Sequence, residues 1–165
     1  MPTTPPKAPS DADQLPRFGQ GVVWQDISVG QRFRTFRRTV TETDLVNFIS
    51  VTGMLEAIFI DATFEGAAMK GRAVPAVLTY ALIEGFILQS MIQGTGLAML
   101  ELTQIIHAPV CVGDTIWAVI EVTEIKPTSK SGRAVVTSRI DVFNQSGSCV
   151  MTYTAKRLLA GRASQ

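Results

Sequence analysis

The chain has 165 residues, of which 46% are hydrophobic and 18% are charged. A chain of this length typically forms one domain, and this composition excludes a wholly disordered protein. Lys and Arg total 15 and Asp and Glu total 14, so the formal net charge is only +1. A chain this close to neutrality lacks the broad basic field that attracts nucleic acid, and we expect no nucleic-acid partner. The two cysteines, Cys111 and Cys149, are far apart and form no CxxC pair. Neither a disulfide framework nor a metal site is therefore predicted.

The ends of the chain differ in composition from the middle. Residues 1–20 are rich in proline and polar residues and predict a mobile tail, and residues 161–165 predict a disordered C-terminus. The single folded domain is expected over residues 21–160. No apolar secretory segment is visible near the N-terminus, so the cytoplasm is the expected compartment. Residues 73–92 approach the length of a membrane span, but Glu84 near their middle favours a buried helix over a membrane helix.

The first expected elements are a strand and a short helix. Residues 32–40 (RFRTFRRTV) are rich in strand-forming side chains. Thr41 and Asp44 then have the spacing of a capping box, in which each side chain bonds the backbone of the other residue. Apolar residues follow at helical spacing, and Gly53 is the expected end of the helix. Residues 54–75 predict irregular structure.

A long apolar helix and four strands are expected in the second half. Residues 76–93 (AVLTYALIEGFILQSMIQ) are apolar around most of the helix circumference, which indicates a helix covered by other elements. Strand-like runs follow, several of them alternating between apolar and polar residues, at 97–107, 115–125, 134–142 and 148–159. The fold class predicted from these patterns is α+β, with an antiparallel sheet that curls around one helix.

The order of these motifs resembles the MaoC-like dehydratase family. The similarity covers about residues 27–158, and its most specific pieces are TVTETD at 39–44, VPAVLTYALIEG at 74–85 and PVCVGDT at 109–115. The resemblance implies a hotdog fold, in which an antiparallel sheet wraps around a long central helix, here about residues 76–93. It also implies a homodimer or higher oligomer, an acyl-CoA thioester as the ligand, and no separate cofactor.

The family's catalytic segment, roughly G-D-x-N-P-x-H-x-D, corresponds here to residues 53–61 (GMLEAIFID). Met54 stands where the resemblance places the catalytic Asp, and Phe59 stands where it places the catalytic His. Neither side chain can transfer a proton, so hydratase activity by the usual pair is not expected. Glu56 is the nearest carboxylate that could replace the pair, and Asp61 matches the segment's second acidic position. Each is more simply interpreted as a solvated or loop-supporting group.

The resemblance places the thioester carbonyl at the start of the long helix. Val74, Pro75 and Ala76 are the expected binding residues there, with Ala76 at a position where the family commonly has Gly. A helix N-terminus offers free N–H groups and a partial positive charge to a developing oxyanion. The other expected binding residues are arginines that would lie on one strand face and could meet the phosphates of coenzyme A, namely Arg32, Arg34 and Arg38.

Two further ionisable residues, His107 and Glu84, have positions that suit ordinary structural roles. His107 is the only histidine, and its position at a strand end predicts a surface or interface residue. Glu84 lies inside the apolar helix, so it must be protonated or hydrogen-bonded if it is buried.

Three functions remain open from the sequence. The first is an acyl-CoA binder of the enoyl-CoA hydratase and dehydratase lineage with a degenerate catalytic pair. The second is a non-catalytic partner of a catalytically complete hotdog chain in a heteromeric hydratase. The third is an acyl-CoA thioesterase that uses Glu56 or Glu84.

Overall fold

The computed structural model describes residues 10, 17–129 and 132–162. The predictions for residues 1–9, 11–16 and 163–165 lie outside the described residues. The helical elements are η2 (Trp24–Asp26), α1 (Glu42–Thr52), α2 (Ala57–Ile60), α3 (Ala76–Phe86) and the π-helical turn η3 (Ile87–Met91). The strands are β1 (Arg32–Arg34), β2 (Arg38–Thr39), β3 (Gly96–Ile106), β4 (Thr115–Pro127), β5 (Arg133–Phe143) and β6 (Cys149–Ala160).

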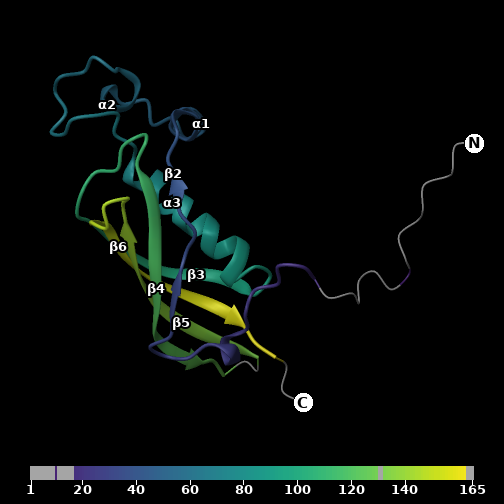
Figure 1. The fold of residues 1–165 in the computed structure, drawn as a ribbon. Helices are drawn as coiled ribbons and strands as arrows, with labels where there is room; N and C mark the ends of the chain where they lie inside the picture. The colour runs from purple at the N-terminus through teal and green to yellow at the C-terminus, as the bar shows by residue number, and fades with distance from the viewer. Residues whose placement is uncertain (1–9, 11–16, 130–131, 163–165) are drawn as a thin grey trace, which may run out of the picture.

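The strands form one antiparallel sheet with the order β1-β4-β5-β6-β3, and β2 also pairs with β4. Because paired residues point to the same face, alternate residues of the central strands form a continuous apolar layer. Ile140 illustrates this layer, since it pairs with Ile120 on one side and with Tyr153 on the other, and all three are buried. Figure 1 shows the sheet curving around α3, which confirms the predicted hotdog arrangement.

Helix α3 lies against the inner face of the sheet, and it is the regular first part of the predicted helix. Leu78, Ile83 and, beyond the regular helix, Ile87 contribute buried apolar side chains to the core. Regular α-helix ends at Phe86, and the wider turn η3 continues only to Met91. The cause is local, because Ile92 closes this turn with a bond to the carbonyl of Ile87 and the backbone then turns toward β3. The helix predicted over about residues 76–93 is therefore confirmed, with a π-helical last turn in place of regular α-helix.

The strand predicted over residues 32–40 is interrupted. Between β1 and β2, the Thr35 amide donates to the Ala118 carbonyl, and the Ala118 amide donates to the Thr35 hydroxyl instead of to a backbone carbonyl. The Thr35 side chain thus replaces one bond of the regular ladder, which breaks the strand pattern. Phe36 in this interruption is exposed. The structure resolves the predicted strand into two short strands, β1 and β2.

The predicted capping box of α1 is confirmed. The Asp44 amide donates to the Thr41 hydroxyl, and the Thr41 amide donates to the Asp44 carboxylate at 2.9 Å. Gly53 ends the helix with a φ of 72°, a left-handed conformation that suits glycine. In Figure 1, α1 and α2 lie together beyond one end of the sheet, and η2 lies near the opposite end.

One long edge of the sheet is uncovered. β3 pairs with β6 on one side only, and nearly all its residues are exposed. Six large apolar residues on β3 are between 38% and 62% exposed: Leu97, Met99, Leu100, Leu102, Ile105 and Ile106. Within the described part of the chain, no helix has both the length and the apolar character that crossing a membrane requires.

Candidate active site

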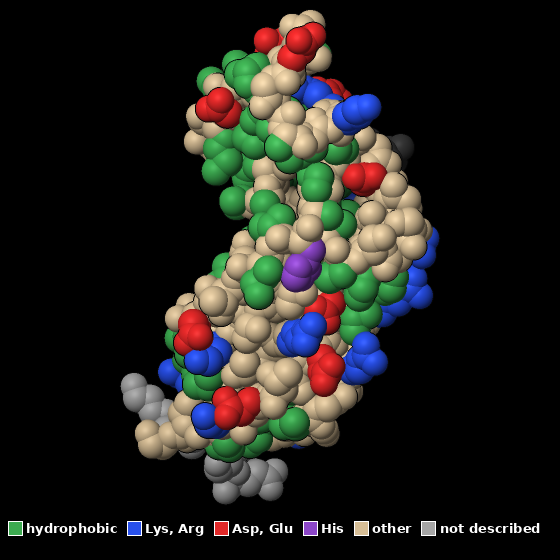
Figure 2. All heavy atoms as spheres, turned by 90° about the vertical axis from the view of Figure 1, so that its left-hand side faces the viewer, with side chains coloured by type: hydrophobic (Ala, Val, Ile, Leu, Met, Phe, Trp, Pro, Cys, Tyr) green, Lys and Arg blue, Asp and Glu red, His purple; other side chains and the backbone are tan. Residues whose placement is uncertain are grey.

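A hollow of about 350 Å³ lies where α3 begins. Its walls come from the α2 segment, from the approach to α3 and from the end of β3. The lining residues are Ile58, Phe59, Met69, Ala73, Val74, Ala76, Ile106, His107, Ala108 and Pro109. Figure 2 shows the molecule narrowing below its upper part, with apolar side chains around this waist and the histidine near it. The hollow is therefore mainly apolar, and His107 is the one ionisable residue among those that line it in the described structure.

The start of α3 is held firmly but its first amides lack helical partners. The Val74 amide donates to the Val110 carbonyl at 2.9 Å, which fixes the approach to the helix. Pro75 precedes the helix and supplies no side-chain cap. The Leu78 and Thr79 amides bond the Pro75 carbonyl, so the earlier amide of Ala76 lies at the open end of the helix, beside the hollow. This end carries a partial positive charge that favours a polarised carbonyl oxygen.

Met54 and Phe59, where the resemblance expects a catalytic pair, lie differently with respect to the hollow. Phe59 forms part of its wall, whereas Met54 does not line it. The guanidinium of Arg72 donates to the Phe59 carbonyl and also pairs with Glu42 of α1 at 2.9 Å. This clamp joins the α2 segment to α1, so the position of Phe59 depends on Arg72.

Neither carboxylate proposed as a substitute lines the hollow. Glu56 precedes α2, is exposed and makes no side-chain cap. Asp61 is exposed and accepts bonds from the Thr63 hydroxyl at 2.7 Å and the Thr63 amide at 2.8 Å. These bonds stabilise the carboxylate and hold the pKa of Asp61 below its ordinary value. Asp61 therefore stabilises its own turn, and its catalytic role stays a prediction.

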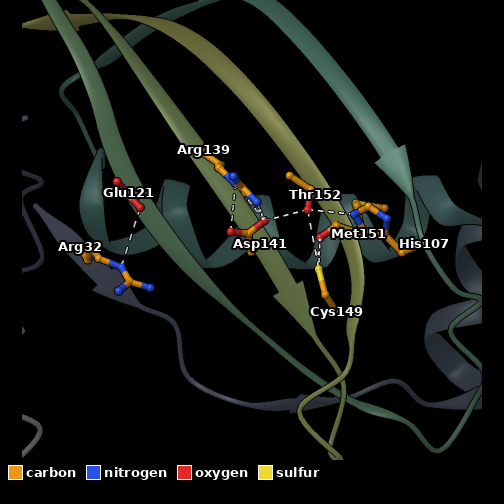
Figure 3. Close-up of polar contacts among 8 residues, drawn as sticks. All are labelled: Arg32, His107, Glu121, Arg139, Asp141, Cys149, Met151 and Thr152. Carbon is orange, nitrogen blue, oxygen red and sulfur yellow. Dashed lines mark hydrogen bonds and ion pairs between the residues drawn. The ribbon is translucent and has the colours of Figure 1, made fainter. Parts of the chain in front are cut away.

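His107, which directly follows β3, belongs to a chain of polar side chains that continues onto β6 and β5 (Figure 3). Its Nε2 lies 3.0 Å from the Thr152 hydroxyl, and that hydroxyl donates to the Asp141 carboxylate at 2.7 Å. Arg139 pairs with Asp141 at 3.1 Å. The sequence alone did not indicate this arrangement. His107, Thr152 and Asp141 lie on separate segments of the chain and become neighbours only through strand pairing.

The three arginines expected to bind phosphate have different surroundings. Arg38 pairs with Asp44 at 2.6 Å, and Arg32 lies 4.0 Å from Glu121, so each has a carboxylate beside it. Arg34 instead stacks on Trp117, with 4.3 Å between the guanidinium carbon and the ring centre. None of the three lines the hollow at the start of α3, and their role in ligand binding stays a prediction.

Glu84 is buried and hydrogen-bonded, as its place in the sequence predicts. Its Oε1 accepts from the Tyr153 hydroxyl at 2.8 Å and from Arg157 at 2.5 Å. Burial and the adjacent Glu84 raise the pKa of Tyr153, so its hydroxyl stays a hydrogen-bond donor. Glu84 does not line the hollow at the start of α3, which separates it from the expected thioester position. Within the described residues, no group of three or more His, Cys, Asp and Glu side chains could hold a metal ion.

Comparisons with known proteins agree with this architecture. A family model described as FAS1-like, dehydratase domain region, matches residues 28–153. The chain is 24% identical over 117 residues to a 3-hydroxybutyryl-CoA dehydratase from Methylorubrum extorquens, covering 71% of this chain and 74% of that protein. The unliganded R-hydratase PhaJ1 from Pseudomonas aeruginosa is 27% identical, with a TM-score of 0.70 over 87% of this chain and 88% of that one. A monoamine oxidase regulatory protein from Archaeoglobus is 26% identical, with a TM-score of 0.77 over 87% of this chain and 97% of that one.

Proposed function

Because the chain belongs to the FAS1-like dehydratase domain family and has a MaoC-like hotdog fold, we propose that it binds acyl-CoA thioesters. The observation that carries this proposal is the apolar hollow at the open start of α3. An acyl chain suits the apolar walls, and the thioester carbonyl suits the Ala76 amide. The name of the related 3-hydroxybutyryl-CoA dehydratase supports the same class of ligand. The cytoplasm remains the expected compartment.

In this proposal the protein belongs to the enoyl-CoA hydratase and dehydratase lineage, but it lacks the Asp and His that usually carry the reaction. Met54 and Phe59 occupy the corresponding positions, and an alkyl thioether and a phenyl ring cannot carry protons. This loss also favours a second candidate function, in which the chain is a non-catalytic partner of a complete hotdog subunit. No comparable observation favours the third function, an acyl-CoA thioesterase. The Glu84 carboxylate already accepts hydrogen bonds from Tyr153 and Arg157.

We also propose that the active form is an oligomer built through β3. The exposed apolar residues of β3 continue onto the open side of the central helix, where Val77, Ala81 and Leu88 share one stripe and are exposed. Apolar surface on both an unpaired strand and an adjacent helix favours a second hotdog chain that extends the sheet. Such a partner is either another copy of this chain or a related subunit.

Ala76→Pro provides a direct test of thioester binding. Proline is tolerated at the first position of a helix, and Pro75 already has extended dihedrals (φ −54°, ψ 135°) that suit a following proline. The substitution therefore removes one amide hydrogen while keeping the helix. Calorimetric titration with butyryl-CoA, a saturated thioester, should show binding to the natural protein and about tenfold weaker binding to the variant, the effect of losing one hydrogen bond.

Ala57→Pro is the matched control, because Ala57 is the first residue of α2 and its predecessor is also extended. It should leave affinity within twofold of the natural protein. If the natural full-length protein binds neither butyryl-CoA nor octanoyl-CoA, the proposed function is wrong. If both proline variants weaken binding equally, the Ala76 amide has no special role.

A further inference from the structure

We propose that His107, oriented by Thr152 and Asp141, is the proton-transfer group that acts on an enoyl thioester in the hollow at the start of α3. This inference rests on the proposed thioester binding and adds to it a reactive side chain outside the segment 53–61. It assigns a catalytic role to a residue for which the sequence predicts only a surface or interface position. The role does not require Met54 or Phe59 to ionise.

The first support is the composition of the hollow. Nine of its ten lining residues are apolar, and the tenth is His107. The other side chains considered for proton transfer, Glu56, Asp61 and Glu84, do not line it. Among the described residues that line the hollow, His107 is therefore the one whose side chain could transfer a proton to a bound ligand. Phe59, which occupies the position of the family's histidine, lines the same hollow.

The second support is the direction of the hydrogen bonds. A hydroxyl has one proton to donate, and that of Thr152 is donated to Asp141 Oδ1. The Thr152 oxygen must then accept from His107, so the proton of the neutral ring is on Nε2. Nδ1 is left with its lone pair and is the ring atom able to accept a proton. Arg139 keeps Asp141 in place through its own ion pair at 3.1 Å, which makes Asp141 and Thr152 positioning residues for His107.

The third support is that the hydrogen bonds fix the ring in one orientation throughout proton transfer. Nε2–H of the ring donates to the Thr152 hydroxyl before and after Nδ1 takes a proton, and Thr152 is itself bonded to Asp141. Cys149 is the other titratable neighbour, with its sulfur 3.7 Å from the Thr152 hydroxyl. Figure 3 shows His107 joined through Thr152 to Asp141 and Arg139 across adjacent strands.

The proposed reaction adds water across the C2=C3 bond of a 2-enoyl thioester. Water oxygen bonds to C3 of the 2-enoyl thioester while Nδ1 of His107 takes one water proton. The electron pair of the C2=C3 bond moves toward the thioester carbonyl, whose oxygen is held by the Ala76 amide as an enolate. The protonated ring then returns its proton to C2 and the carbonyl re-forms. The product is a 3-hydroxyacyl thioester, the ring is regenerated, and the reverse sequence is dehydration.

Nitrogen-15 NMR tests the orientation of the ring without any assay of activity. Because the chain has one histidine, the imidazole signals of tag-free protein need no assignment. The spectrum of the natural protein should show the Nε2–H form, and Thr152→Val should lose this preference. Thr154→Val is the matched control, because Thr154 lies two residues along the same face of β6 and should leave the form unchanged. Equal tautomer populations in the natural protein and in Thr152→Val would overturn the positioning role.

Hydration of trans-2-butenoyl-CoA and trans-2-octenoyl-CoA tests the chemistry, with butyryl-CoA affinity measured on the same samples. His107→Gln should lower kcat/KM by about 10²–10⁴-fold, the usual contribution of an acid–base group. Its butyryl-CoA affinity should stay within twofold of that of the natural protein. If butyryl-CoA binds but neither enoyl thioester is hydrated, or if His107→Gln hydrates as fast as the natural protein, the role of His107 is wrong while the binding proposal stands. If no thioester binds, the proposed function itself fails.

Discussion

The guanidinium of Arg157 lies 2.5 Å from the carboxylate of Glu84, and both residues are buried, at 6% and 7% exposed. The pair joins α3 to β6 inside the core, and the Tyr153 hydroxyl shares the same carboxylate oxygen. Two charges this far from water are stable only together, since each alone would lack its compensating partner.

We therefore expect Glu84→Gln to lower the free energy of unfolding by about 3–5 kcal/mol, because it leaves the Arg157 charge buried without a counter-charge. Urea denaturation followed by circular dichroism measures the change. The double variant Glu84→Leu with Arg157→Met removes both charges and should be more stable than Glu84→Gln. A double variant less stable than Glu84→Gln would contradict this view of the pair.

The capping box of α1 should give a pH-dependent contribution to stability. Burial alone raises the pKa of Asp44, but bonds from the Thr41 amide and hydroxyl and the pairing with Arg38 outweigh it and lower the pKa below its ordinary value. The stabilisation is thus fully present above the ordinary aspartate pKa of about 3.9 and is lost as pH falls through the lower folded value.

Thr41→Ala should lower the free energy of unfolding by about 1 kcal/mol near neutral pH, the usual effect of losing an N-cap. Asp44→Asn should also lower the free energy of unfolding near neutral pH. This loss relative to the natural protein should shrink as the pH falls below the pKa that the Asp44 carboxyl group has in the unfolded chain. Denaturant titrations at a series of pH values provide the comparison. A deficit for Asp44→Asn that grows on acidification would have the wrong sign.

Charge placed on the open face of β3 or of the helix formed by α3 and η3 should weaken self-association. Leu97→Glu and Leu88→Glu each place a carboxylate on this surface, and burying it in an interface is unfavourable. Sedimentation equilibrium should show the dimer dissociation constant raised at least about tenfold, equivalent to about 1.4 kcal/mol. Leu55→Glu, an exposed residue between α1 and α2, is the control and should leave association unchanged. A natural protein that stays monomeric at high concentration would remove the basis for the oligomer.

Arg34 is the arginine for which we expect the largest effect on binding of the nucleotide part of coenzyme A. Its guanidinium lies on Trp117, whereas Arg32 and Arg38 have carboxylates beside them. Arg34→Ala should weaken butyryl-CoA binding about threefold to tenfold, less so at high salt. It should leave binding of butyryl-pantetheine, which lacks the nucleotide, unchanged.

Arg133→Ala on β5 removes an equal charge elsewhere and is the matched control for Arg34→Ala. If Arg34→Ala weakens the binding of butyryl-CoA and of butyryl-pantetheine equally, Arg34 supports the fold and does not bind phosphate.

Local patterns predicted much of the fold because the interactions behind them are themselves local. The bonds between Thr41 and Asp44 span three residues, and the alternation of β5 follows directly from the strand geometry. The end of the helix was predicted less well, because the turn η3 depends on backbone bonds that an apolar sequence does not reveal.

The candidate site was only partly predictable for a related reason. The start of the helix at Ala76 could be read from the sequence, since Pro75 precedes a long apolar segment. The neighbours of His107 could not, because Thr152 and Asp141 come from two other strands and their proximity depends on the pairing register. The isolated position of His107 in the sequence gave no sign of these partners.

The interruption at Thr35 has a consequence for how large an assembly can become. A sheet with two long unpaired borders could add further copies at either border and grow into a fibre. Here the border opposite β3 consists of two strands of three and two residues, separated where the Thr35 hydroxyl bonds the Ala118 amide. Pairing through β3 would cover the one long edge of each copy, so the assembly would stop at a dimer.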